Sequence, residues 1–125
     1  MSIVYDAGVL VAADRDDRRV WADHRIRLEA DVVPTTTAPV VAQVSRSPRQ
    51  VQLRRFLRGC ETVPFSPDQA HVVGALLGES STTDIVDAHL VITAATTTST
   101  VITSDLGDIR KISNHLHTPI PVKHT

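Results

Sequence analysis

Short runs of β-branched residues alternate with longer helical segments along this chain of 125 residues. The runs are too short for helices and are rich in Val, Ile and Thr, which favours buried strands. Strands that alternate with helices are joined by right-handed crossovers and pair in parallel. We expect strands at residues 2–5, 31–35, 62–65 and 100–104, with 120–122 as a candidate edge strand.

The helical segments carry recognisable start and stop signals. Ser66 before Pro67 is typical of an N-cap followed by a first-turn proline. Gly59 and Gly78 are placed to end helices, and a threonine at 82–83 is placed to begin one. The predicted helices, caps included, cover residues 7–13, 17–29, 37–44, 47–57, 66–77, 83–96 and 106–114.

The length and composition indicate one globular domain, residues 1–125, with its own core. Hydrophobic residues make up 42% of the chain and aromatic residues only 3%, so we expect a mainly aliphatic core. Cys60 is the only cysteine, which excludes an intramolecular disulfide and a clustered-cysteine zinc site. No segment approaches the roughly 18 apolar residues of a membrane span, and Asp6 interrupts the apolar N-terminus. We therefore expect a cytoplasmic protein without membrane contact.

Aspartates follow two of the predicted strands. Asp6 comes directly after strand 2–5, and Asp105 follows strand 100–104, with Asp108 three residues later. Because the carboxyl ends of parallel strands meet at one edge of a sheet, we expect these carboxylates to lie close together. Crowded carboxylates repel one another unless a cation neutralises them, and a hard divalent metal is the usual partner. The pattern favours metal-assisted hydrolysis of a phosphodiester.

Two further carboxylates lie on the predicted helix 83–96. Asp84 and Asp87 are three residues apart and therefore share one face of the helix. The strand-end aspartates also suit helix capping, and Asp84 alone suits a first helical turn. Asp87 is harder to explain in that way, because apolar residues surround it in the sequence.

The order strand–Asp, buried helical Asp, strand–Thr-x-Asp resembles the PIN-domain ribonuclease family, and within it the VapC-type toxins of bacterial toxin–antitoxin pairs. The resemblance rests on residues 3–6, 84–88 and 101–109 and covers nearly the whole chain. It implies an α/β fold, a three-layer α/β/α PIN-like domain with a central parallel sheet of four to five strands. It also implies an endoribonuclease that depends on Mg²⁺ or Mn²⁺ and hydrolyses RNA phosphodiester bonds.

The resemblance carries the family's roles onto particular positions of this chain. The implied metal ligands are Asp6, Asp87 and Asp105. Thr103, the first residue of the Thr-x-Asp motif, would offer its hydroxyl to an aspartate or to a metal-bound water. The implied supporting residues of the catalytic site are Asp84, Asp108 and Gln43.

Two positions depart from the family pattern. The family usually has a glutamate where Gln43 stands, and an amide keeps one acceptor oxygen but removes a negative charge. Gly8 stands where a hydroxyl residue is common in relatives. Gln43 motivates an alternative function, a catalytically weakened PIN-like domain that acts by binding RNA or a protein partner. Cleavage measured with added Mn²⁺ separates the two functions.

Positive charge is concentrated between residues 46 and 58, although the formal net charge of the chain is −1. This stretch contains five arginines and no acid, which suits an RNA backbone held without sequence readout. A solvated helix face is the simpler interpretation. The predicted RNA-binding residues are Arg46, Arg49, Arg54, Arg55 and Arg58.

Apolar residues in segment 7–30 predict surfaces for protein partners. The simpler interpretation of these residues is packing in the core. The family resemblance favours partners, because VapC-type toxins are neutralised by a VapB-type protein. It implies a groove for the helix of a cognate VapB-type antitoxin and a homodimer surface.

Overall fold

A five-stranded parallel sheet runs through the centre of the molecule in the order β3-β2-β1-β4-β5. The structure is a computed structural model that describes all residues from 1 to 125. The strands are β1 (Ile3–Tyr5), β2 (Thr35–Thr37), β3 (Glu61–Val63), β4 (Thr100–Thr103) and β5 (Val122–His124). The predicted parallel α/β class is confirmed.

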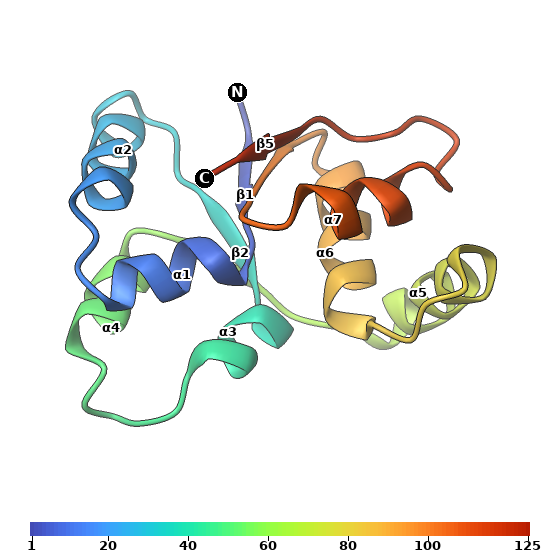
Figure 1. Ribbon diagram of the computed structural model, residues 1–125, viewed down its shortest axis with the longest axis horizontal. Coiled ribbons are helices and arrows are strands. Elements are labelled where there is room, and N and C mark those ends of the chain that lie inside the picture. Colours follow the sequence, from blue (N-terminus) through green and yellow to red (C-terminus); the bar gives the residue numbers. More distant parts are fainter.

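Seven helices cover the two faces of the sheet. They are α1 (Ala7–Asp14), α2 (Arg18–Glu29), α3 (Ala38–Val44), α4 (Val51–Arg58), α5 (Pro67–Ser80), α6 (Ile85–Thr96) and α7 (Leu106–Ser113). Helix α1 packs against α2, α3 and α4 on one side, and α6 packs against α5 and α7 on the other (Figure 1). The predicted three-layer architecture is therefore confirmed. None of these helices combines the length and the apolar character that crossing a bilayer requires.

Strand β1 occupies the centre of the sheet, and the chain order reverses on either side of it. Strands β2 and β3 lie on one side of β1, and β4 and β5 lie on the other. Val4 pairs with Thr35 of β2 and with Val101 of β4. Open parallel sheets bind ligands outside the carboxyl ends of the strands at such a reversal. The residues that follow β1 and β4 therefore lie at one edge of the sheet, beside the reversal.

The core is mainly aliphatic, but an aromatic cluster lies between the sheet and helices α2 and α4. The ring of Phe56 lies 5.4 Å from that of Tyr5, 5.1 Å from that of Trp21 and 4.0 Å from that of His24. The Tyr5 hydroxyl is 3.0 Å from the His24 ring and accepts a hydrogen bond of 3.0 Å from Arg27. Burial lowers the pKa of His24 to about 4, so the ring is neutral at pH 7. The cluster fixes α2 and α4 over the central strand.

Two strands begin later than predicted, each directly after a proline. Strand β2 was expected at 31–35 but begins after Pro34, because Asp31 adopts a left-handed conformation (φ 60°) and the chain turns there. Strand β5 was expected at 120–122 but begins after Pro121, which has no amide hydrogen and contributes only its carbonyl. Strands β3 and β4 differ from prediction by one or two residues at their ends.

The predicted start of helix α4 was wrong. The helix was expected from residue 47 but begins at Val51. The side-chain oxygen of Gln50 accepts the backbone amides of Arg46 and Ser47 at 2.6 and 3.0 Å. These bonds hold residues 46–50 as a loop, so the first two predicted RNA-binding arginines precede the helix.

The predicted junction between α5 and α6 was also wrong. Helix α5 was expected to stop at Gly78 but ends before Ser81, whose left-handed conformation (φ 55°) breaks it. A threonine at 82–83 was expected to cap α6. The cap is Asp84, whose carboxylate accepts the amide of Asp87 at 2.9 Å. One of the predicted site acids is therefore also a helix cap.

Candidate active site

The carboxylate of Asp6 lies where the central strands β1 and β4 end. One oxygen accepts the amide of Ala7 at 2.7 Å, and the other accepts the hydroxyl of Thr103 at 2.6 Å. The Thr103 oxygen accepts the amide of Asp105 at 2.9 Å. Asp6 and Thr103 are both buried. The Thr-x-Asp motif therefore joins the ends of the two central strands through hydrogen bonds.

Asp105 caps helix α7 and is exposed to solvent. Its carboxylate accepts the amide of Asp108 at 3.3 Å. The hydrogen bond with Asp105, followed by the charge of Asp105, raises the pKa of Asp108. Asp6 and Asp84 cap helices in the same way, at α1 and α6. A carboxylate has about four acceptor positions, so capping leaves capacity for another ligand.

Asp87 has a strongly perturbed carboxyl group. Burial is the largest cause, and together with the charges of Asp84, Asp6 and Asp108 it raises the pKa of Asp87 to about 7. These four carboxylates come from the β1–α1 junction, from α6 and from α7. Their mutual repulsion is the expected consequence of acids placed around one crevice, and a proton or a cation would relieve it.

A small cavity lies between α6 and α7. It has a volume of about 100 Å³ and is lined by Thr82, Asp84, Asp87, Asp108, Lys111 and Ile112. No three His, Cys, Asp or Glu side chains of the chain are arranged as a ready-made metal site. The carboxylates that line this cavity belong to Asp84, Asp87 and Asp108. Carboxylate oxygens are the ligands that Mg²⁺ and Mn²⁺ accept. The chemistry of the donor set therefore fits a hard divalent cation.

Several solved structures share this fold. VapBC2 from Rickettsia felis, bound to a DNA fragment from their promoter, matches with a TM-score of 0.71 and 16% identity over 100% of this chain and 99% of that chain. FitAB bound to the IR36 DNA fragment matches with a TM-score of 0.65 and 16% identity, over 98% of this chain and 94% of that chain. PAE2754 from Pyrobaculum aerophilum matches with a TM-score of 0.63 and 16% identity, over 97% of this chain and 90% of that chain. The chain has the PIN-domain fold. Neither a scan of protein-family models nor a search of curated proteins finds a match.

Gln43 lies near the end of α3 and is exposed. Helix α3 packs against both α1 and α6, the helices that follow Asp6 and carry Asp87. The side chain of Gln43 makes no hydrogen bond within the protein. The side chains of Asp6, Asp84, Thr103 and Asp105 are held by capping or strand-end bonds, whereas Asp87 and Asp108 contribute only their backbone amides to these bonds. The role of Gln43 toward a metal stays a prediction.

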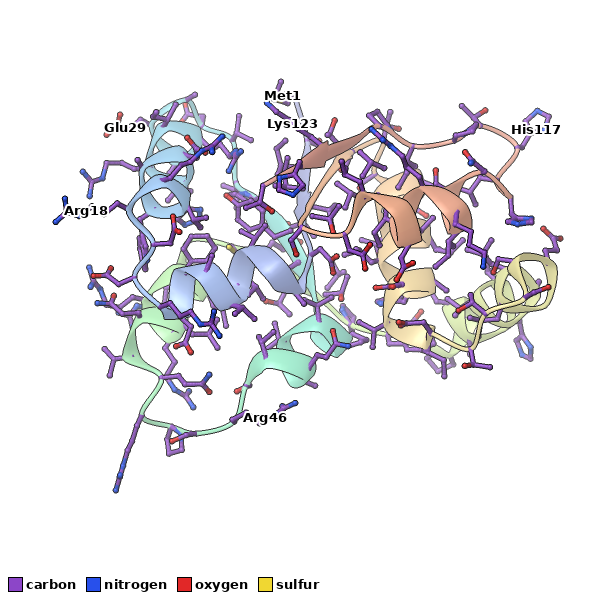
Figure 2. The ribbon with its side chains drawn as sticks, in the orientation of Figure 1. Met1, Arg18, Glu29, Arg46, His117 and Lys123 are labelled. Carbon is purple, nitrogen blue, oxygen red and sulfur yellow. The ribbon has the colours of Figure 1, made fainter.

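The five predicted RNA-binding arginines do not form one helix face. Arg46 lies at the end of α3 (Figure 2), where its guanidinium donates to two backbone carbonyls, each at 2.9 Å. Arg55 lies over the ring of Trp21, 5.4 Å from its centroid, and donates to Gln52 at 2.9 Å. The exposed arginines whose guanidinium groups make no hydrogen bond within the protein are Arg49, Arg54 and Arg58.

Sequence reasoning missed two residues near the acids. Lys111 lines the acidic cavity, and its charge partly offsets the shift in the pKa of Asp108. Their spacing of three residues on one helix was an available signal for this contact. Ser104 packs against Gly8, which explains why a glycine stands there. No feature of the sequence indicates that contact, because it joins residues from opposite ends of the chain.

Proposed function

We propose that this PIN-fold domain is a metal-dependent endoribonuclease and the toxin of a VapBC-like type II toxin–antitoxin pair. The observation that carries the proposal is the gathering of Asp84, Asp87 and Asp108 around one small cavity between α6 and α7, where burial and neighbouring carboxylates also raise the pKa of Asp87 to about 7. Asp6 follows β1 at the reversal of the strand order, where parallel sheets bind ligands, and its charge is one of those that act on Asp87. The resemblance to VapC-type toxins and the fold shared with VapBC2 and FitAB support the biological class.

Asp6, Asp87 and Asp105 would hold a Mg²⁺ or Mn²⁺ ion, with Asp84 and Asp108 beside them. Such an ion supplies a water molecule of lowered pKa and neutralises charge on the scissile phosphate. Asp6 is oriented before any ligand binds, because the Ala7 amide and the Thr103 hydroxyl hold its two oxygens. That preorganisation is what a site for charge stabilisation requires.

The cognate VapB-type antitoxin would cover exposed apolar side chains on helices α2 and α4. Ile26 of α2 is 63% exposed and Val51 of α4 is 61% exposed. An amphipathic helix that lays its apolar face over such residues is a common form of peptide recognition. Homodimer formation stays a prediction of the family resemblance.

Cleavage of RNA tests the proposal directly. The purified protein should cut single-stranded RNA in Mn²⁺ and should not cut it in chelator. Its expression should arrest bacterial growth, and the product of the neighbouring reading frame should relieve the arrest. Gln43 favours the alternative of a weakened domain, because the amide lacks a charge. RNA that is bound but not cut in Mn²⁺ would support that alternative and reject the ribonuclease.

Gln43→Glu is expected to tighten Mn²⁺ binding about threefold to tenfold, because it adds a negative charge near the proposed site. Isothermal titration of the wild type and the variant measures the difference. Gln52→Glu is the matched control, since it makes the same substitution on α4, away from the acids. Equal affinities in all three proteins would show that Gln43 does not act on the metal.

Replacing Arg49 and Arg58 by Ala is expected to weaken RNA binding and flatten its salt dependence. On a single strand each phosphate that an arginine neutralises contributes about 0.7 to the log–log salt slope, so removing two arginines should lower the slope by about 1.4. Arg46→Ala is the contrasting variant, because that guanidinium already bonds backbone carbonyls. Fluorescence anisotropy at several salt concentrations gives the slopes. An unchanged slope in the double variant would assign these arginines to a plain solvated surface.

A further inference from the structure

Ser104 lies between two residues of the candidate site and has a free hydroxyl. Its neighbour Thr103 donates to the Asp6 carboxylate and accepts the amide of its other neighbour, Asp105. The Ser104 side chain is exposed and makes no hydrogen bond within the protein. A serine that serves structure commonly caps a helix or bonds the backbone, as Ser66 and Ser80 do here. The hydroxyl of Ser104 is therefore available to a ligand.

The position of this hydroxyl depends on the glycine opposite it. A Cβ added at Gly8 would overlap the Ser104 hydroxyl and would lie 2.9 Å from the Ser104 Cβ and 3.4 Å from its backbone nitrogen. Gly8 has no left-handed backbone conformation, so the glycine serves close approach and not backbone freedom. Gly8 lies in the first turn of α1, where amides lack partners within the helix. The hydroxyl is thus held against the first turn of α1, where the amides of Ala7 and Val9 donate to Asp6.

A groove continues from this contact along α1. It has a volume of about 470 Å³ and is lined by Gly8, Val11, Ala12, Arg15, Asp17 and Ser104. The carboxylate of Asp17 accepts the amide of Val20 at 3.0 Å, whereas Arg15 is exposed with no hydrogen bond from its guanidinium. The groove therefore has a free hydroxyl at one end and a free guanidinium near the other, with apolar Val11 and Ala12 between them.

We propose that Ser104 is a substrate-binding residue whose hydroxyl donates to a phosphate oxygen next to the scissile phosphodiester. The RNA strand leaves the acidic crevice past Ser104 and follows the groove along α1 towards Arg15. This inference rests on the proposed function. A hydroxyl and a guanidinium suit successive phosphates, and the apolar floor between them suits a ribose or a base.

RNA binding without cleavage tests Ser104. Anisotropy of a labelled single-stranded oligoribonucleotide is measured in chelator, with every protein carrying Asp87→Asn so that no RNA is cut. Ser104→Ala is expected to weaken affinity about tenfold, the usual effect of losing a hydrogen bond to a charged group. Gly8→Ala should weaken it as much, because the new methyl displaces the hydroxyl. Ser2→Ala is the matched control, an exposed serine before β1 at the opposite end of the strands, and should have no effect.

A swap of the two residues separates the hydroxyl from general packing. Gly8→Ser combined with Ser104→Gly returns a hydroxyl to the same space from the other side. The double variant should bind RNA within about threefold of the parent, whereas Ser104→Gly alone should bind about tenfold more weakly. Thermal unfolding of each variant checks that all remain folded. The inference would be overturned if Ser104→Ala and Gly8→Ala bound RNA as tightly as the Ser2→Ala control. It would also be overturned if the double variant bound RNA no more tightly than Ser104→Gly alone.

The failure of this inference is distinguishable from the failure of the proposed function. A wild type that does not cut RNA in Mn²⁺ rejects the ribonuclease, but Ser104-dependent binding in chelator would still establish the site. A wild type that cuts RNA with KM unchanged by Ser104→Ala rejects only the role of Ser104. If Ser104→Ala weakens a complex with the antitoxin and leaves RNA binding intact, the groove belongs to a protein partner and the RNA path is wrong.

Discussion

Asp87→Asn is expected to abolish RNA cleavage and to leave the protein folded. The substitution keeps the shape of the side chain but removes a charge from the proposed metal site. A decrease of at least about 100-fold in cleavage rate follows, since metal-assisted charge stabilisation contributes several kcal/mol. The variant should also not arrest growth. A folded variant that still cuts RNA would move the chemistry away from α6.

The same variant should be more stable than the wild type in chelator at neutral pH. The pKa of Asp87 is about 7 in the folded protein and 3.8 ordinarily, so ionisation of this acid opposes folding. The penalty is absent below about pH 4, grows as the pH rises and is complete above about pH 7. Because the side chain is half-buried and partly screened, the gain should be about 1 kcal/mol, or about 4 °C in Tm.

Thermal unfolding between pH 4 and pH 8 measures this difference. The melting curves of the wild type and Asp87→Asn should coincide near pH 4 and separate towards pH 8. Added Mn²⁺ should raise the Tm of the wild type but hardly that of the variant, since a ligand stabilises only the state that binds it. Asp68→Asn makes the same substitution at an exposed site on α5 and is the control. A variant that is unfolded in chelator would make Asp87 a structural residue.

Thr103→Val is expected to destabilise the protein by about 3 kcal/mol, or about 10 °C in Tm. The hydroxyl is fully buried, donates to the Asp6 carboxylate at 2.6 Å and accepts the Asp105 amide at 2.9 Å. Valine has nearly the same shape as threonine but no hydroxyl. The Asp6 carboxylate and the Asp105 amide would therefore each lose one hydrogen-bond partner. The removal of a partner from a buried carboxylate dominates the effect.

Thr93→Val is the matched control for this substitution. Thr93 is only 3% exposed, but its hydroxyl has no hydrogen-bond partner. Its replacement by valine removes an unsatisfied polar atom and should change stability by less than about 0.5 kcal/mol, or increase it. Differential scanning calorimetry of both variants decides the comparison. Equal effects at the two positions would show that the strand-end hydrogen bonds do not hold the crevice together.

The sequence was most informative where one physical rule acts alone. The ends of β1 and β4 were predicted within one residue because β-branched runs stop at Asp6 and near Thr103. The parallel pairing of these strands then brought the two residues to one edge, as expected. The loop before α4 was not predictable in the same way, because a single side chain, Gln50, replaces helical hydrogen bonds there.

The candidate site was predicted in its parts but not in its contacts. The acids that influence Asp87 were all named from their positions after strands and on one helix face. The contact between Gly8 and Ser104 was not foreseen, because the two segments come so close that a methyl group on residue 8 would overlap the Ser104 side chain. Periodicity and propensity describe elements one at a time. The separation at which two elements pack depends on all the side chains between them.

The hydrogen bond between Thr103 and Asp6 joins residues 97 positions apart in the chain. During synthesis Asp6 therefore leaves the ribosome well before β4, and β1 has no β4 beside it until that later strand emerges. Pairing over such a distance is slow, and domains fold as units once their parts are available. With the proposed activity, this order of events would keep a growing chain inactive as a nuclease until β4 has been synthesised and paired.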